Sequence, residues 1–359
     1  MLSSEQILTI KEAQSEAIHK KSLTANQLKL AYDNNWFNLW VPKEYGGKEA
    51  KLGDGLALLE ALAYEDGGFA WTVTLCSGAN MFAGFLEPGL AQELFNKKDI
   101  CWGGSGRASG TANWDGEHYV LRGEWQYATG APHLTHFTLN ARLFEHGQAV
   151  YDKNGEPKVS SFFVPRDQVL VHYDWTSFGL ECTASHSFSL QDVGVPKSHA
   201  FSLGPQAKTS QSPLFELPFM PFAELTLVVN YIGMFRRFLD LVERYFFEKA
   251  KDTEWAKQYS KDRFKLLDGF QVDFEQRRGH VFKLAEQIWS NILSDAVEAN
   301  TMIYEELSVE ARSFVADMRQ QVVQLFPLLG ILASQMENEL NIVFRNIFTA
   351  SQHSLLNGR

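Results

Sequence analysis

Residues 113–130 read NWDGEHYVLRGEWQYATG, and this stretch decides how the middle of the chain folds. The pair Asp115-Gly116 precedes His118-Tyr119-Val120-Leu121, and Asp-Gly supplies the positive φ angles that a tight hairpin turn needs. Further short strands with glycine turns between them are predicted downstream, over residues 136–144, 159–164, 169–173 and 186–190. Regular short strands of this kind predict a small β-sandwich or barrel.

The residues before these strands predict helices. The segments that begin at Ser3 and at Thr24 each fit a capping box, in which a hydroxyl residue is followed three positions later by Gln. Apolar residues then recur at helical spacing over residues 52–64 and 69–86. We therefore expect an N-terminal helical domain over residues 1–99.

The residues after the strands also predict helices. Apolar side chains recur there at positions i, i+3, i+4 and i+7, the pattern of one buried helix face. Four such segments follow one another, the last over residues 340–356, and residues 249–262 are typical of a solvated connection. The sequence thus predicts an α+β multidomain chain: an N-terminal helical domain (1–99), a middle β-sandwich or barrel domain (100–204) and a C-terminal four-helix bundle (213–359).

Composition narrows the function classes. The 359 residues carry 33 Lys+Arg against 43 Asp+Glu, a formal charge of −10, which argues against a general nucleic-acid binder and an anionic membrane surface as partner. No apolar run is long enough to span a membrane, and the N-terminus lacks the features of a signal peptide, so we expect a cytoplasmic protein. The 27 Phe, 9 Trp and 11 Tyr suit a flat apolar ligand, although composition alone favours an aromatic-packed core.

The sequence predicts no metal site and no disulfide framework. Cys76, Cys101 and Cys182 are odd in number, widely spaced and outside any CxxC motif. His133 and His136 fit HxxH but lack a third ligand nearby in sequence.

Three stretches are candidates for chemistry, each with an ordinary structural alternative. Residues 103–106 are glycine-rich but precede strands, so they do not form a Rossmann loop; a flexible loop and a ligand-contacting loop both stay open. Trp125 and Tyr127 could stack on a planar ring beside Thr129, yet the pattern alone favours one ordinary sandwich face. Arg345, Thr349 and His353 share one helix face, where His353 is either a general base or a hydrogen-bonded histidine near a helix end, and spacing alone favours the latter.

Several segments resemble the acyl-CoA dehydrogenase superfamily. Residues 41–47, VPKEYGG, are similar to its VPxEYGG segment. Residues 116–130 are similar to its dGyxlnGxKxwiTn region, and residues 187–196, SFSLQDVGVP, resemble its vxFxdVxVP strand. The order of helices, β-domain and helix bundle matches as well, so the resemblance covers nearly the whole chain.

The resemblance implies a flavin, FAD or FMN, where the domains meet. By the matched motif, Tyr127 and Thr129 would line the isoalloxazine ring and Gly130 would allow close approach. The segment with Trp102, Gly104 and Ser105 would lie against the flavin or the substrate. This reverses the interpretation of Trp125 and Tyr127 as an ordinary sandwich face.

The branch is indicated by residues 345–353, RNIFTASQH, which resemble the RDxxTAxxH segment of the group D flavin-dependent monooxygenases. These enzymes take reduced flavin from a separate reductase and use O2. The match implies that His353 is a base or hydrogen-bonding group near the flavin, and that Thr129 is a partner of the flavin hydroperoxide. Asn80, Arg345 and Thr349 are expected in the substrate pocket. Asn346 departs from the family's Asp, which would remove an ion pair with Arg345, and Asn80 stands where some relatives carry His.

Three hypotheses follow from the resemblance. The first is a two-component monooxygenase acting on a small substrate, with aromatic compounds among the candidates, a flavin reductase as partner and His353 and Thr129 as catalytic residues. The second is an FAD-dependent acyl-CoA dehydrogenase that introduces an α,β double bond, with Glu224 or Glu243 as the base. The third is a flavin-binding homologue without catalysis. The superfamily also implies a homo-oligomer, a tetramer or dimer.

Overall fold

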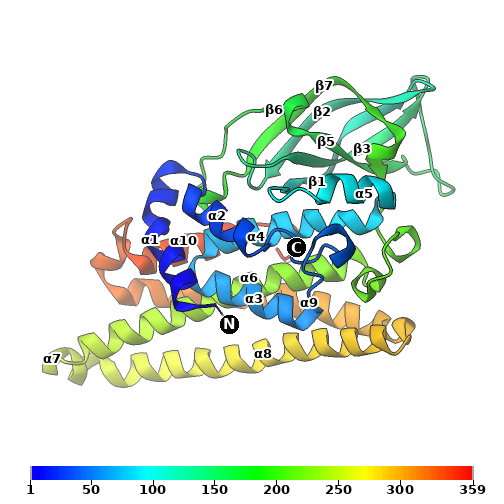
Figure 1. The fold of residues 1–359 in the computed structure, drawn as a ribbon. Coiled ribbons are helices and arrows are strands. Elements are labelled where there is room, and N and C mark those ends of the chain that lie inside the picture. The colour runs from blue at the N-terminus through cyan, green and yellow to red at the C-terminus, as the bar shows by residue number, and fades with distance from the viewer. Residues whose placement is uncertain (1, 358–359) are drawn as a thin grey trace.

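The computed structural model describes residues 2–357, and its element order is helices, sheet, helices (Figure 1). The N-terminal helices are α1 (Ser4–Lys20), α2 (Ala25–Asp33), α3 (Leu52–Glu65), α4 (Gly67–Asn80) and α5 (Pro88–Phe95). Both predicted capping boxes are formed, because Ser3 accepts from the backbone of Gln6 and Thr24 accepts from that of Gln27, and each Gln side chain bonds back. The sequence thus correctly placed the starts of α1 and α2.

The middle of the chain forms one eight-stranded mixed sheet. Its strands are β1 (Trp102–Trp114), β2 (His118–Ala128), β3 (His136–Glu145), β4 (Gln148–Ala149), β5 (Val159–Pro165), β6 (Leu170–Val171), β7 (His186–Pro196) and β8 (Ala200–Phe201). Their order is β6-β7-β2-β1-β3-β5-β8, with β4 paired to β3. The predicted Asp-Gly hairpin joins β1 to β2 in antiparallel pairing, whereas β1 and β3 run parallel.

The glycine-rich residues 103–106 lie inside β1, so their interpretation as a loop is wrong. The reason is a close approach between strands that only glycine permits. A Cβ atom at Gly104 would stand 1.8 Å from the carbonyl oxygen of Thr138 on β3. Gly104 therefore serves strand pairing at this point.

The C-terminal part is the predicted bundle of long helices. It contains α6 (Phe219–Lys249), the short α7 (Thr253–Trp255), α8 (Lys261–Leu293), α9 (Asn300–Leu325) and α10 (Glu339–Ala350). The segment expected as a solvated connection, residues 249–262, is largely helical and leads into α8. The last helix ends at Ala350, earlier than the predicted 356, because the chain turns at residues 351–352.

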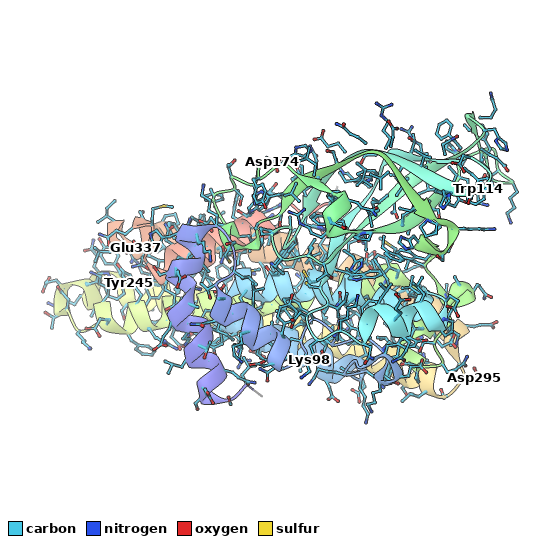
Figure 2. All side chains as sticks on the ribbon, turned by 45° about the horizontal axis from the view of Figure 1, so that its top comes forward. Lys98, Trp114, Asp174, Tyr245, Asp295 and Glu337 are labelled. Atoms are coloured by element: carbon cyan, nitrogen blue, oxygen red, sulfur yellow. The ribbon has the colours of Figure 1, made fainter. Side chains whose placement is uncertain are left out.

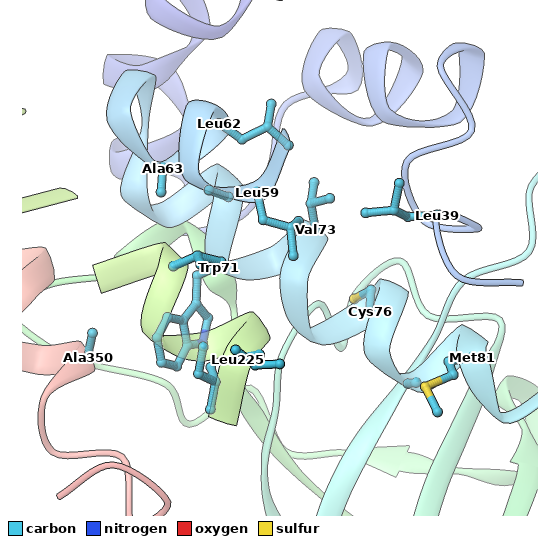
Figure 3. Close-up of a cluster of buried hydrophobic side chains, with 14 of the residues drawn as sticks. Leu39, Leu59, Leu62, Ala63, Trp71, Val73, Cys76, Met81, Leu225 and Ala350 are labelled. Atoms are coloured by element: carbon cyan, nitrogen blue, oxygen red, sulfur yellow. The ribbon is translucent and has the colours of Figure 1, made fainter. Parts of the chain in front are cut away.

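The helix α4 lies between the sheet and the bundle, with α8 on the side away from the sheet (Figure 1). It contacts both β1 and α6, and nearly all of its side chains are buried. Figure 3 shows part of the core around it, including Trp71 and Cys76 on α4 and Leu59 on α3. Trp114 at the sheet hairpin and Glu337 before α10 lie toward opposite ends of the molecule in Figure 2. The predicted fold class is confirmed.

Within residues 2–357, no helix combines the length and the apolar character needed to cross a membrane.

Candidate functional site

Two aromatic residues near the end of β2, Trp125 and Tyr127, lie in different environments. Trp125 is fully buried, stacks on Phe188 with ring centroids 5.4 Å apart, and donates from Nε1 to the carbonyl of Asn140 at 2.9 Å. Tyr127 is 59% exposed, because the β2–β7 register shifts between Trp125 and Ala128. Simple alternation would have put both rings on one face. The bulge leaves the Tyr127 ring exposed, while Trp125 belongs to the core.

Thr129 begins a chain of three buried hydroxyl groups. Its Oγ1 lies 2.9 Å from Oγ of Ser185, which in turn lies 2.8 Å from Oγ1 of Thr183. Thr183 donates to the carbonyl oxygen of Leu180 at 2.9 Å. A hydroxyl has one hydrogen, so Ser185 must donate to Thr183 and Thr129 must donate to Ser185. Thr129 therefore offers only lone pairs to a ligand.

Backbone strain gathers around this chain. Tyr127, Tyr173, Leu180 and Ala184 all have left-handed φ angles, between 45° and 68°, although none is glycine. Each such residue costs roughly 1–2 kcal/mol and persists only where its surroundings fix it. Such strain is typical of ligand-binding sites, so its concentration near Thr129 favours a site here.

The helix α10 joins the same region through Arg345. The guanidinium is 3% exposed, forms an ion pair with Glu181 and donates to the carbonyl of Phe178 at 2.9 Å. Asn346 accepts from the backbone N–H of Leu180 at 2.7 Å. Arg345 thus keeps an ion pair, with Glu181 in place of the Asp that the family has at position 346. Asn346 instead links α10 to Leu180, whose carbonyl oxygen accepts the last hydrogen bond of the hydroxyl chain.

Thr349 lies one turn further along α10, and its hydroxyl oxygen is buried without a hydrogen-bond partner. A Cβ atom at Gly179 would stand 2.7 Å from that oxygen, so the loop before Leu180 closes over it. A buried hydroxyl without a partner costs free energy unless a ligand or water satisfies it. It is a second polar atom at the junction that suits a ligand.

His353 lies beyond the end of α10, so it does not share a helix face with Arg345 and Thr349 as the spacing suggested. Its ring packs edge-on against Trp71 with centroids 5.8 Å apart. Burial lowers the pKa of the imidazole, so the ring is neutral at neutral pH. Its Nδ1 accepts from the backbone N–H of Leu355 at 3.3 Å, which leaves the hydrogen of the neutral ring on Nε2.

Three comparisons with known proteins bear on this geometry. No family model matches the chain. The chain is 22% identical to the indole-3-acetate monooxygenase of Acinetobacter baumannii, over 86% of this chain and 79% of that protein. It is 21% identical to HsaA, the oxygenase subunit of a flavin-dependent monooxygenase of Rhodococcus jostii, over 69% of this chain and 68% of HsaA.

Solved structures agree with these relatives. HsaA of M. tuberculosis superposes with a TM-score of 0.89 at 15% identity, over 98% of this chain and 92% of that one. XiaF from Streptomyces, solved in complex with FADH2 and glycerol, gives 0.84 at 21% identity, over 98% and 91%. The chain has the fold of these solved monooxygenases. It is most like the group D flavin-dependent monooxygenases, and the predicted resemblance is confirmed.

The other residues expected at the superfamily site lie deeper in the protein. Trp102 is fully buried and stacks on Phe163 at 4.7 Å, with an unpaired indole nitrogen. Ser105 follows on β1, partly buried. Asn80 uses its amide hydrogens on Asn38 and Ile100 and accepts from the backbone of Trp102. Asn80 therefore supports the start of β1, and its contact with substrate stays a prediction.

The two glutamates of the dehydrogenase hypothesis are engaged in the bundle. Glu224 accepts from Arg312 and Ser308 of α9, each at 2.9 Å. Glu243 accepts from Gln271 of α8 at 3.2 Å. Both carboxylates already have partners within the bundle, and their role as a base stays a prediction.

The residues 181–185, ECTAS, were missed by sequence reasoning. They supply the ion-pair partner of Arg345 and two of the three hydroxyls. A run of small and hydroxyl residues just before the recognised strand at 187–196 was the available signal. The structure also brings together Cys76, Cys101 and His133, three candidate ligands that lie far apart in sequence.

Proposed function

We propose that this protein is a flavin-dependent monooxygenase that uses reduced flavin and O2 on a small aromatic substrate. The observation that carries the proposal is the direction of the hydroxyl chain, which leaves Thr129 as an acceptor at the sheet–bundle junction. A reduced flavin carries a hydrogen on N5, whereas the oxidised ring has a bare acceptor nitrogen there. An acceptor at Thr129 suits the reduced form, as expected where a separate reductase supplies it.

The residues at the junction fit a flavin ring. Tyr127 offers an exposed aromatic face, the φ of 79° at Gly130 suits glycine, and the Thr349 hydroxyl lacks a partner. When bound, the flavin would supply the electrons that O2 needs to insert one atom into the substrate. The protein would hold the ring, exclude water and place hydrogen-bonding groups beside it.

His353 suits the role of a donor better than that of a base. Because Nδ1 already accepts from Leu355, the neutral ring donates from Nε2. Taking a proton at Nδ1 would break that bond and charge a ring whose pKa is lowered by burial. Of the two roles open at the outset, we therefore favour hydrogen bonding to the bound ligands.

The aromatic substrate class comes from relatives. One relative is named an indole-3-acetate monooxygenase, and a structural neighbour, TdsC from Paenibacillus, was solved with FMN and indole. The naming of HsaA as an oxygenase subunit supports a reductase as partner. We also propose a homo-oligomer, since large apolar side chains are exposed on the bundle at Val272, Met302, Val309 and Ile331.

The first experiment measures binding. Titration under argon should show tighter binding of reduced than of oxidised FMN or FAD. Ser185→Ala removes the acceptor of the Thr129 hydrogen. The ratio of the dissociation constants of oxidised and reduced flavin should then fall by about 2–10-fold, the range expected for one neutral hydrogen bond. Ser161→Ala, which removes a hydroxyl bonded to Asn140 in the same sheet, is the control and should leave it unchanged. Equal binding of both redox forms by the unaltered protein would contradict the proposal.

The second experiment measures chemistry. With a flavin reductase, NADH and 18O2, the protein should insert labelled oxygen into indole or indole-3-acetate. His353→Ala should lower the amount of labelled product formed per NADH consumed. Bleaching of bound oxidised flavin by an acyl-CoA under argon would instead support the dehydrogenase. Flavin binding without either reaction, across a panel of indoles and phenols, would support the non-catalytic homologue.

A further inference from the structure

A group of metal-binding side chains lies behind the Thr129–Gly130 turn. It consists of Cys76 on α4, Cys101 just before β1 and His133 in the turn after Gly130, and we name it the Cys–Cys–His group. Their sulfur and ring-nitrogen atoms all lie within 4.8 Å of one another. Both cysteines are fully buried and neither is in a disulfide. Three chain segments thus converge on one point inside the protein.

The histidine of this group has an unmet hydrogen-bonding need. Its Nε2 is buried and has no partner. A Cβ atom at Gly130 would stand 2.8 Å from that nitrogen and 3.2 Å from the sulfur of Cys76, so the two atoms face the same small space. A buried polar atom without a partner in a native structure calls for an explanation, and an ion is one.

The chemistry of the group selects the kind of ion. Two thiolates and an imidazole are ligands for Zn²⁺, whereas Mg²⁺ and Ca²⁺ prefer oxygen. Two thiolates would neutralise the dication, so the buried complex would carry no net charge. Coordination requires both thiols to lose their protons, so binding of the ion would release them to solvent.

A fourth oxygen ligand is available on either side of the group. The Tyr32 hydroxyl lies beside Cys101, and the carbonyl oxygen of Thr129 lies 3.7 Å from the sulfur of Cys76. The rings of Phe37 and Tyr32 line this side, since Phe37 lies 5.8 Å from His133 and 5.0 Å from Tyr32.

We propose that Cys76, Cys101 and His133 bind one Zn²⁺ ion in a structural site. Such an ion would tie α4, the start of β1 and the turn after β2 to one another. The Thr129 carbonyl beside Cys76 would then be fixed in place, and with it the turn that carries the candidate flavin residues. The proposal does not depend on the flavin chemistry, because the ligands are separate from Tyr127 and the Thr129 hydroxyl.

The test is the zinc content of the whole protein, purified under reducing conditions without a polyhistidine tag or chelator. We expect about one zinc per chain by mass spectrometry after zinc addition and gel filtration. Cys101→Ser and His133→Gln should each lose most of it. Cys182→Ser is the matched control, since Cys182 is also buried but lies outside the group, and it should keep the zinc. Flavin binding is not needed for this measurement.

Cobalt substitution keeps the test decisive if the variants fail to fold. The unaltered protein with Co²⁺ in place of zinc should show thiolate-to-cobalt charge-transfer absorption and the visible bands of a tetrahedral site. The proposal is overturned if the protein takes up no zinc and shows no such spectrum. It is equally overturned if His133→Gln binds as much zinc as the unaltered chain, or if Cys76 and Cys101 form a disulfide during reducing purification.

Discussion

The helix bundle and the sheet–bundle junction differ in backbone strain and in how fully their charged groups are paired. In the bundle, Arg277 bonds Glu310 at 2.8 Å and also pairs with Asp317, and Arg278 holds Glu60 with two bonds of 2.6 and 2.8 Å. No residue inside α6, α8 or α9, all within the described chain, has a positive φ angle. These helices pair their charged groups and carry little backbone strain, although Oδ1 of Asn230, the Tyr304 hydroxyl and Oε1 of Gln321 are buried there without partners.

The junction leaves polar atoms unsatisfied and holds strained backbone. Unpaired buried atoms there include the Thr349 hydroxyl, Nε of Arg345 and one oxygen of Glu181. Left-handed residues such as Tyr127 and Leu180 flank the same space. Backbone strain of this kind persists only where the surrounding structure fixes it, and here it is found at the junction and not within the long helices.

The largest expected effect comes from the ion pair between the two parts. Arg345→Met should destabilise the protein by about 3–5 kcal/mol, because it leaves the buried Glu181 carboxylate without its partner. Urea unfolding followed by circular dichroism measures this. Lys29→Met removes an exposed pair with Asp33 and should cost less than about 1 kcal/mol. Equal losses would mean that the junction pair is no more important than a surface pair.

A smaller effect is expected on acidification. Burial is the main cause that lowers the pKa of His136 to about 4, so the folded protein resists a proton that the unfolded chain takes up near pH 6.5. The unfolded state then binds more protons between these values, and stability falls as the pH falls from 7 to 5, by about 1–2 kcal/mol from this residue. His136→Phe should flatten that slope in urea midpoints measured at both pH values.

The effect of His136→Phe depends on how the His136 ring is packed. His136 lies beside Trp102 and Phe163, so phenylalanine keeps the aromatic packing. A control is His118→Phe, because His118 is exposed on the hairpin. An unchanged slope in His136→Phe would show that other groups cause the acid sensitivity.

The smallest effect has the opposite sign. Thr349→Val removes a buried hydroxyl that has no partner, so without flavin it should stabilise the protein by up to about 1 kcal/mol. Thr226→Val removes a hydroxyl that donates to the Phe222 carbonyl in the bundle at 3.0 Å, and it should not stabilise. Thr349→Val should also weaken flavin binding. Destabilisation by both substitutions would erase the distinction between the two regions.

Local sequence patterns predicted the regular elements well. The Asp115-Gly116 turn, the two capping boxes and the apolar faces of the long helices depend on neighbours within a few residues, which the sequence displays directly. The resemblance placed the flavin near Tyr127 and Thr129, and that assignment stays a prediction supported by the geometry.

The features that were missed depend on residues distant in sequence. Trp125 and Tyr127 separate because of a bulge against β7, which alternation in β2 does not reveal. Glu181 replaces the partner expected next to Arg345, although 164 residues separate the two. The Cys–Cys–His group comes from three segments with no common spacing.

The hydrogen bond from the Leu180 backbone to Asn346 has a consequence for folding kinetics. It joins residues 166 positions apart, so the loop that it closes contains β7, β8 and most of the bundle. Contacts of such long range form late, because the entropy of closing the loop must be met before they contribute. Secondary structure and much of the core should therefore appear before the junction is assembled, and flavin binding should be regained in the slowest phase of refolding.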